Sequence, residues 1–261
     1  MTHLPVEKRA AMPVIIQIEN LVHRFADGTV GLEGVSMEVA EGSFVIIAGA
    51  NGSGKTTLLR HLNGLLRPTA GTVRVAGVDV AKDLLRARTM VGMMFQDADS
   101  QIVGETVSAD AAFGPENLKL DRAEIDRRVQ AALAATGLAH LAGKRPHLLS
   151  GGEKRRLAIA GILAMQPRVI VFDEPFSNLD YPGVRQVLGQ ILQLHRSGQT
   201  ILLTTHDLEK VLAHADRLVF MRGGKVECDG PPPALVAAAE AYGVKRPRAA
   251  GLGVEGLSWL N

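Results

Sequence analysis

A glycine-rich stretch at residues 49–57 carries the clearest chemical signal of this chain, because it reads GANGSGKTT and matches the pattern G-x-x-x-x-G-K-[ST]. The apolar run 44–48 precedes it and residues 55–62 show helical spacing, so we expect it at a strand-to-helix junction. Glycines let the backbone approach phosphate oxygens, and the free N–H groups of a helix start favour an anion. Lys55 adds positive charge, and the Thr56 hydroxyl would complete the oxygen shell of Mg²⁺. The predicted nucleotide contacts are Gly49, Ala50, Asn51, Gly52, Ser53, Gly54, Lys55, Thr56 and Thr57.

Acidic and imidazole side chains follow two other predicted strands. Asp173 and Glu174 come after residues 168–172, and His206 follows residues 200–205. Open parallel sheets bind ligands at the carboxyl ends of their strands, where an Asp suits a Mg²⁺ contact and a Glu could orient or deprotonate a water. A plain turn is the alternative for the two acids, and a structural role is the alternative for the histidine.

Two further signals are ambiguous when each is taken alone. A helix is expected to begin behind Ser150, Gly151 and Gly152, and its first N–H groups would suit a phosphate. The alternative is a capped helix whose glycines allow close packing. Phe25 could stack on a purine base, or it could pack as an ordinary strand residue.

The surrounding pattern predicts an α/β fold. A first strand is expected at residues 14–19, and short strands near 21–25, 35–39 and 44–48 suggest antiparallel pairing at the front of the fold. The alanine-rich region from Asp97 to His147 is typical of a helical insertion. Later predictions are an edge hairpin over residues 217–228 and a short helix after Pro231, with loose order from Lys245 onward.

Composition narrows the class of protein. The chain has 261 residues, 46% of them hydrophobic, which is enough for a sizeable core. A formal net charge of +2 is too mild to indicate nucleic acid as a partner. The single cysteine, Cys228, excludes an intrachain disulfide framework and indicates a reducing compartment. No stretch approaches the 18 apolar residues of a membrane span, so we expect a chain that is neither spanning nor exported, with only a peripheral membrane role.

The motifs occur in an order that resembles the ATP-binding subunit of ABC transporters, from about residue 14 to 240. The resemblance implies a P-loop NTPase (RecA-like) core with an antiparallel β subdomain and an inserted helical subdomain at about residues 97–165. It implies ATP and Mg²⁺ as cofactors and ATP hydrolysis as the activity. The sequence departs from the family at Phe25, where tyrosine is commoner, and at Glu153, where glutamine is commoner.

The resemblance also assigns roles to residues. Residues 49–57 match the Walker A loop, residues 149–153 match the family signature, and residues 177–180 match the D-loop. By resemblance, the signature contacts the ATP of a partner subunit, so ATP closes a dimer and hydrolysis releases it. The implied site residues are catalytic Lys55, Gln96, Glu174 and His206, nucleotide contacts Phe25, Ser150, Gly151, Gly152 and Asp180 beside the loop, and metal ligands Thr56, Gln96 and Asp173.

Three segments are similar to the energy-coupling factor (ECF) type of importer, at residues 96–103, 112–118 and 157–165. Asp97-Ala98-Asp99 departs from the usual Asn-Pro-Asp of that class. The class takes up vitamins or the transition metals cobalt and nickel. Its implied partners are a second ATPase subunit, identical or homologous, an integral membrane coupling subunit and a substrate-binding membrane subunit. The chain would lie at the cytoplasmic face of the membrane.

The predicted organisation is a flexible tail at 1–12, with Met12 as a possible true start, a single ATPase domain at 13–240 and a C-terminal tail at 241–261. Two alternatives remain, namely another class of ABC transporter and a soluble ABC-type ATPase of translation or DNA repair. One phosphate loop and no heptad run disfavour the soluble class. Glu174 and His206 disfavour a module that holds ATP without hydrolysing it.

Overall fold

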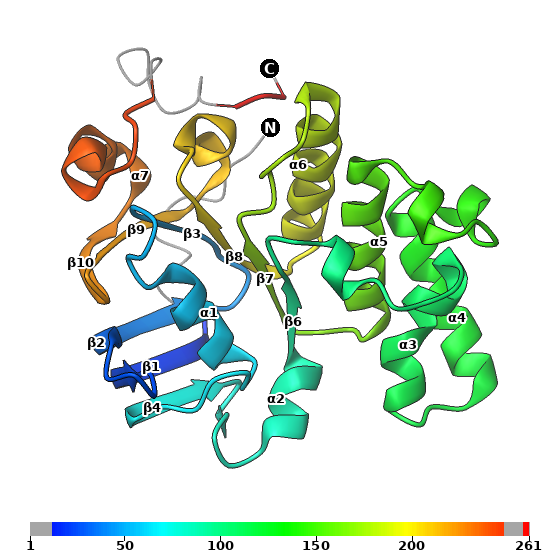
Figure 1. Ribbon diagram of the computed structural model, residues 1–261, viewed down its shortest axis with the longest axis horizontal. Coiled ribbons are helices and arrows are strands. Elements are labelled where there is room, and N and C mark those ends of the chain that lie inside the picture. The colour runs from blue at the N-terminus through cyan, green and yellow to red at the C-terminus, as the bar shows by residue number, and fades with distance from the viewer. Residues whose placement is uncertain (1–11, 248–257, 261) are drawn as a thin grey trace.

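The computed structural model describes residues 12–247 and 258–260, and a six-stranded sheet runs through its middle (Figure 1). The strand order is β10-β9-β3-β8-β7-β6, and every neighbouring pair is parallel except β9 with β10. The carboxyl ends of five parallel strands therefore meet at one edge of this sheet. The strands are β3 (Phe44–Ala48), β6 (Val91–Met94), β7 (Val169–Asp173), β8 (Thr200–Thr205), β9 (Arg217–Arg222) and β10 (Lys225–Gly230).

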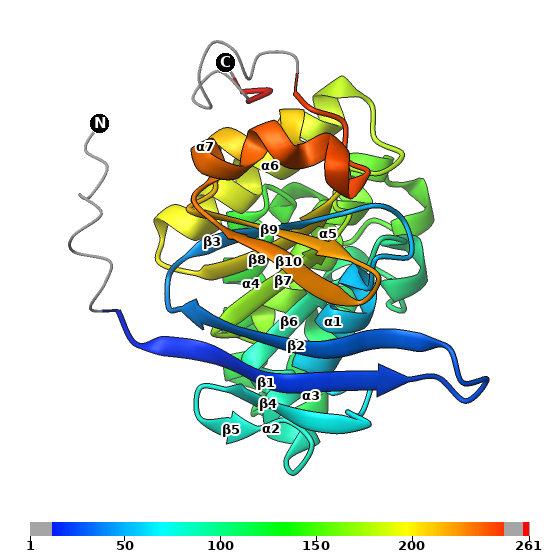
Figure 2. The same ribbon diagram turned by 90° about the vertical axis from the view of Figure 1, so that its left-hand side faces the viewer.

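An antiparallel sheet forms a separate layer, with β1, β2 and β4 side by side in Figure 2. Its order is β2-β1-β4-β5. The prediction that residues 44–48 join this antiparallel layer is wrong, because β3 pairs in parallel with β8 and β9. All five β3 residues are buried, as a strand covered on both faces requires. The strands of this layer are β1 (Val14–Arg24), β2 (Val30–Ala40), β4 (Ala70–Val75) and β5 (Val78–Asp79).

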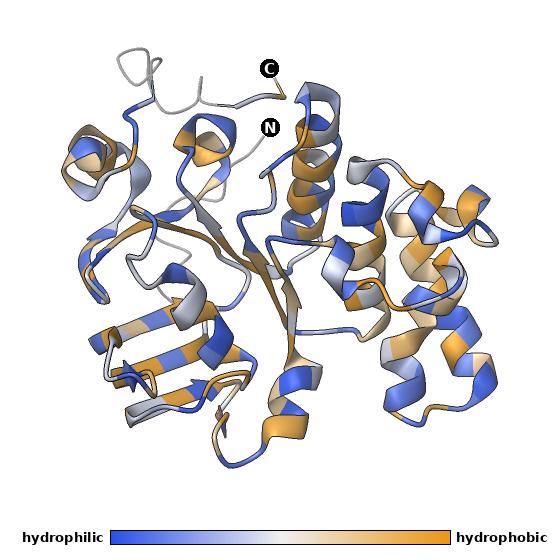
Figure 3. Cartoon of the chain, viewed as in Figure 1, coloured by the Kyte–Doolittle hydropathy of each residue, from blue (hydrophilic) through white to orange (hydrophobic). Residues whose placement is uncertain are grey.

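The two faces of the central sheet bury separate apolar clusters. Alternate side chains of β3 divide between them, with Phe44 and Ile46 on one face and Val45 and Ile47 on the other. Helix α1 (Lys55–Leu62) and the antiparallel sheet cover the second face, whereas α6 (Tyr181–Arg196) covers the first. In Figure 3 the central strands are hydrophobic along their length, whereas the antiparallel strands alternate in hydropathy.

A group of helices lies beyond α6 and has an apolar cluster of its own (Figure 1). Val107, Ile125, Val129 and Leu157 belong to this cluster. Helix α5 contributes to both the helical cluster and the central one, so it joins the two parts. The helices of this group are α3 (Val107–Asn117), α4 (Arg122–Ala135) and α5 (Gly151–Ala164), with the short 3-10 helices η2 (Asp99–Gln101), η3 (Ala139–Leu141) and η4 (Pro146–Leu148). Helix α2 (Leu84–Met90) lies apart from them, and its Ala87 belongs to the cluster on the second face of the central sheet.

The packed structure continues past residue 240. The Tyr242 ring stacks on Phe220 with centroids 4.7 Å apart, and Val244 belongs to the central cluster. Trp259 lies 5.3 Å from the ring of Tyr181. Residues 1–11 of the predicted flexible tail at 1–12, and residues 248–257 and 261 of the predicted C-terminal tail, lie outside the described residues. The last elements are η5 (Leu208–Lys210), η6 (Leu212–His214), α7 (Pro232–Leu235) and η7 (Val236–Tyr242). Within the described ranges, no helix is both long and apolar enough to cross a membrane.

Candidate functional site

The glycine-rich loop connects β3 to α1, as the sequence predicts. Two of its glycines are sterically required. A Cβ on Gly49 would lie 2.3 Å from the carbonyl oxygen of Met221, and a Cβ on Gly54 would lie 2.8 Å from that of Gly31. Gly54 also has a φ of 103°, a conformation that other residues rarely adopt. The loop therefore keeps its shape only with glycine at both positions.

Lys55 is held inside this loop. It is 6% exposed, and its Nζ donates hydrogen bonds to the carbonyl oxygens of Gly49 at 2.8 Å and Ala50 at 3.0 Å. Burial lowers the pKa of Lys55, while the charges of Glu174 and Asp173 raise it. The ammonium group is thus positioned by backbone and faces two carboxylates across the site. An anion bound between them would offset the desolvation of the lysine.

The start of α1 is open to an anion. Its N-cap is Gly54, which makes no side-chain cap hydrogen bond. The first N–H groups of a helix have no partner within the helix, and they carry the positive end of the helix dipole. Because α1 begins at Lys55, these N–H groups lie beside the lysine. A phosphate is the ligand that this arrangement suits best.

The predicted metal ligands converge beyond the loop. Asp173, which is 3% exposed, accepts hydrogen bonds at the same oxygen, Oδ1, from Thr56 Oγ1 at 3.1 Å and Thr204 Oγ1 at 2.7 Å. Thr56, Asp173 and Gln96 line one cavity of about 520 Å³. A hydroxyl, a carboxylate and an amide fit Mg²⁺, which takes oxygen ligands and prefers to share its shell with water and phosphate. Within the described residues, no group of three or more His, Cys, Asp and Glu forms an all-protein metal cage.

Glu174 lies between the metal ligands and His206. Its backbone has a φ of 49°, an unusual value for a side-chain-bearing residue, and its N–H donates to Thr204 Oγ1 at 3.0 Å. Its carboxylate Oε1 is 3.0 Å from Nδ1 of His206. The strained turn directs the carboxylate into the cavity, where it could act on a water molecule.

One cavity of about 490 Å³ collects most of the predicted site. Phe25 lines its other end and is 40% exposed, with its ring edge-on to His23 at 4.6 Å. This exposure leaves room for a flat base, although the contact with His23 also satisfies the packing alternative. The predicted residues that line this cavity are Phe25, Asn51, Gly52, Ser53, Gly54, Lys55, Thr56, Thr57, Gln96, Glu174 and His206.

Six predicted nucleotide contacts do not line this cavity. Two of them, Gly49 and Ala50, belong to the loop and accept hydrogen bonds from Lys55, and the other four are Ser150, Gly151, Gly152 and Asp180. Ser150 caps α5 instead. Its hydroxyl accepts from the N–H of Glu153 at 3.3 Å, and Glu153 Oε2 accepts from the N–H of Ser150 at 2.7 Å. This backbone hydrogen bond lowers the pKa of Glu153. Asp180 caps α6 by accepting from the N–H of Gly183 at 2.9 Å. Within one chain, the capped-helix alternative therefore describes these residues.

Sequence reasoning missed Thr204 and Gln101, which hold the site in place. Thr204 donates to Asp173 and accepts from Glu174, so a hydroxyl near the end of an apolar strand was the available signal. Gln101 accepts from the N–H of Phe95 at 2.7 Å and donates to the carbonyl oxygen of Met93 at 2.9 Å. No local pattern indicates that Gln101 would fold back onto the strand that leads to Gln96.

Known proteins are similar to this chain over most of its length. The family model described as ABC transporter matches residues 32–177. The cobalt import ATP-binding protein CbiO of Syntrophus aciditrophicus is 50% identical over 203 residues, which cover 77% of this chain and 72% of that protein. The energy-coupling factor transporter ATP-binding protein EcfA of Methanocaldococcus jannaschii is 44% identical over 221 residues, which cover 84% of this chain and 79% of that protein.

Solved structures agree with these relatives. The CbiO1 protein of Clostridium perfringens, described as part of the ABC transporter complex CbiONQ, superposes with a TM-score of 0.80 at 36% identity and covers 92% of this chain and 98% of its own. An ATP-binding cassette has been solved as a dimer in a post-hydrolysis state with ADP and Pi. It superposes with a TM-score of 0.74 at 27% identity and covers 84% of this chain and 99% of its own.

Proposed function

This chain belongs to the ABC transporter family, as an ATPase subunit of the ECF and CbiO type of importer, and we propose that it powers uptake by closing a dimer around ATP. The observation that carries the proposal is the single cavity that joins the phosphate loop to Gln96, Glu174 and His206. The family relationship favours this function over that of a soluble ATPase of translation or DNA repair. The proposed cargo is cobalt, another transition metal ion or a vitamin.

Each residue around the cavity has a proposed part in hydrolysis. The loop amides and Lys55 would bind the β- and γ-phosphates, and Phe25 would stack on the base. Mg²⁺, when bound by Thr56, Asp173 and Gln96, would neutralise phosphate charge. Phosphoryl transfer to water depends mainly on positioning and charge stabilisation. Glu174 would orient the attacking water and accept its proton, while His206 holds the carboxylate 3.0 Å away.

A second ATPase subunit completes the proposed site. Ser150 and Gly151 are exposed at the start of α5 and lie outside the cavity of their own chain. We assign them, with Gly152 and Asp180, to the γ-phosphate side of an ATP held by the partner. A related cassette is solved as a dimer with ADP and Pi, which supports the pairing of two ATPase subunits. Binding can drive closure only to the extent that ATP binds the closed dimer more tightly.

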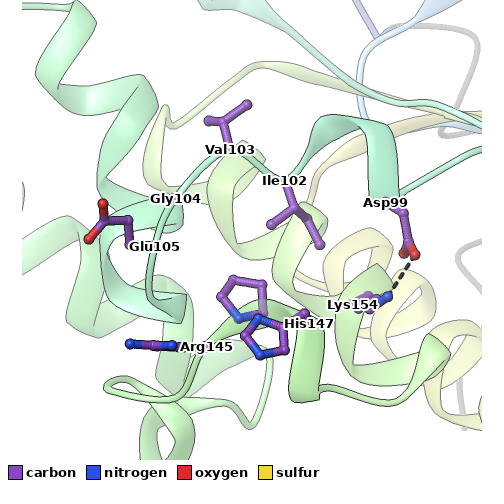
Figure 4. Close-up of a pocket in the computed structure, with 9 residues that line it drawn as sticks. Asp99, Ile102, Val103, Gly104, Glu105, Arg145, His147 and Lys154 are labelled. Carbon is purple, nitrogen blue, oxygen red and sulfur yellow. Dashed lines mark hydrogen bonds and ion pairs between the residues drawn. The ribbon is translucent and has the colours of Figure 1, made fainter.

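The proposed docking site for the membrane subunits is a cavity of about 570 Å³ between η2 and η4. In Figure 4, Ile102 and His147 lie between the Asp99–Lys154 ion pair and Glu105. Apolar and charged side chains together suit a short amphipathic helix of a partner. The segment that begins at Gln96 leads directly into this cavity. A peripheral position at the cytoplasmic face of the membrane follows from this proposal.

The substitution Glu174→Gln tests the proposed hydrolysis. The amide cannot accept a proton, so we expect ATP turnover to fall about a hundredfold or more while ATP binding changes by less than about threefold. The variant should also accumulate as an ATP-bound dimer in gel filtration. A matched control is Glu33→Gln, since Glu33 is an exposed partner of Lys225. Wild-type turnover in Glu174→Gln would show that another residue activates the water.

A further inference from the structure

Arg155 lies one turn into α5, between the signature residues and the hydrolysis site. It is 6% exposed, although it carries a permanent charge. Its Nη1 donates to the carbonyl oxygen of Gln96 at 3.2 Å, and its Nη2 donates to the carbonyl oxygen of Ser177. Burial lowers the pKa of Arg155, and the charges of Asp99 and Asp97 raise it. The guanidinium is therefore held mainly by two backbone oxygens of other segments.

The two carbonyl oxygens that accept from Arg155 belong to two different segments of the site. Gln96 lines both the nucleotide cavity and the cavity of the predicted metal ligands. Ser177 follows Glu174 and is tied to it, because its N–H donates to the carbonyl oxygen of Glu174 at 3.2 Å. Gln96, Glu174 and Ser177 also line a further cavity of about 320 Å³ together with His206. One buried side chain thus connects α5 to Gln96, among the predicted metal ligands, and to the turn after Glu174, the residue that would act on water.

A second contact reinforces the first of these connections. Lys154, the neighbour of Arg155 on α5, forms an ion pair with Asp99 at 2.6 Å (Figure 4). This pair joins α5 to η2, three residues beyond Gln96. It is more exposed than the contacts of Arg155, since the Asp99 side chain is 61% exposed, so solvent screens it. The buried fork of Arg155 is the stiffer of the two connections.

We propose that Arg155 is a positioning residue for hydrolysis, which fixes Gln96 and the turn after Glu174 relative to the signature helix. The inference rests on the proposed function. When Ser150 engages the ATP of the partner, α5 would carry Arg155 with it, and both attached segments would follow. The planar guanidinium suits this task because its donors have a fixed spread, whereas a lysine ammonium offers one point of attachment.

The substitution Arg155→Met tests the proposal, because it keeps the stem and removes the donors. We expect kcat to fall about tenfold or more while the KM for ATP changes by less than about twofold, since the phosphate loop is untouched. Arg155→Lys should recover only part of kcat. The control is Arg168→Met, which removes an exposed arginine that pairs with Glu41. A rise in KM at unchanged kcat, or wild-type kinetics in Arg155→Met, would overturn the proposal.

A double-mutant cycle separates positioning from general destabilisation. If Arg155 acts largely through Gln96, Arg155→Met should cost at least about threefold less in kcat when it is made in a Gln96→Ala background. Losses that simply multiply would contradict the proposal. If Arg155→Met does not fold, the same double-mutant cycle is measured with Arg155→Lys in its place. Absence of ATP turnover in the wild-type protein would instead refute the proposed function.

Discussion

Two helices of this molecule have glycine at their start, and they begin differently. Helix α1 follows Gly54, which has a φ of 103° and makes no side-chain cap hydrogen bond. Helix α5 follows Ser150, whose hydroxyl and N–H are both engaged by Glu153 in a capping box. Both starts suit an anion by charge alone. The start of α1 has an open first turn beside a buried lysine, whereas the start of α5 is already partly satisfied.

The difference indicates a division of labour between the two helix starts. The α1 start lies in a cavity with the residues that would act on phosphate, so we expect it to bind its ligand within one chain. The α5 start presents Ser150 and Gly151 to solvent, away from that cavity. Its capping box holds the helix in shape before any ligand arrives. We infer that the α1 start provides affinity for ATP and that the α5 start provides closure of the dimer.

The largest expected effect comes from removing the charge at the α1 start. Lys55→Ala should lower ATP turnover about a hundredfold or more and should weaken ATP binding to the isolated chain, because a preorganised donor to the phosphates is lost. Turnover assays and equilibrium ATP titration measure both effects. Lys225→Ala removes a half-exposed lysine as the control. Equal ATP affinity in Lys55→Ala and wild type would contradict the assignment of ATP binding to the α1 start.

The next effect concerns the α5 start. Ser150→Ala should lower kcat about tenfold while ATP affinity of the isolated chain changes by less than about twofold, because Ser150 lies outside the cavity of its own chain. The same two assays apply. Ser150→Thr keeps a hydroxyl cap and serves as the control. If Ser150→Ala weakened ATP binding as much as Lys55→Ala does, the two helix starts would not divide the work.

Phe25 sharpens the comparison from the base end of the cavity. Phe25→Ala should weaken ATP binding to the isolated chain by about fivefold, which corresponds to about 1 kcal/mol of stacking. Phe25→Tyr should bind ATP as the wild type does. Binding of inorganic triphosphate, which has no base, should be the same in all three proteins. Unchanged ATP binding in Phe25→Ala would establish the packing role of this residue instead.

The smallest effect concerns the stability of the α5 start. Glu153→Gln should lower the free energy of unfolding by less than about 1 kcal/mol at neutral pH, because the amide still accepts from Ser150. The pKa of Glu153 is lowered from 4.5 in the folded chain, so its carboxylate stabilises the fold above that value. This contribution is lost as pH falls through the lowered pKa. Denaturant unfolding at about pH 7 and about pH 3 should therefore show a difference that shrinks in acid.

Local patterns predict the α1 start and the helix beginning at Ser150, because both depend on neighbouring residues. They mislead at residues 44–48, since the choice between parallel and antiparallel partners for an apolar strand depends on chain segments more than 150 residues away. They miss Arg155, whose acceptors are 59 and 22 positions away along the chain. They also leave both alternatives open for Ser150, because a capping serine and a phosphate contact have the same local sequence.

The division of labour is tested most directly by mixing two defective chains. Lys55→Ala and Ser150→Ala are each purified, assayed alone and then combined in equal amounts with ATP and Mg²⁺. In a mixed dimer, one site holds both defects, while the other pairs an intact Lys55 with an intact Ser150 of the opposite chain. Half of the dimers are mixed, so turnover should rise to about a quarter of the wild-type rate. A mixture no more active than its components would contradict the account.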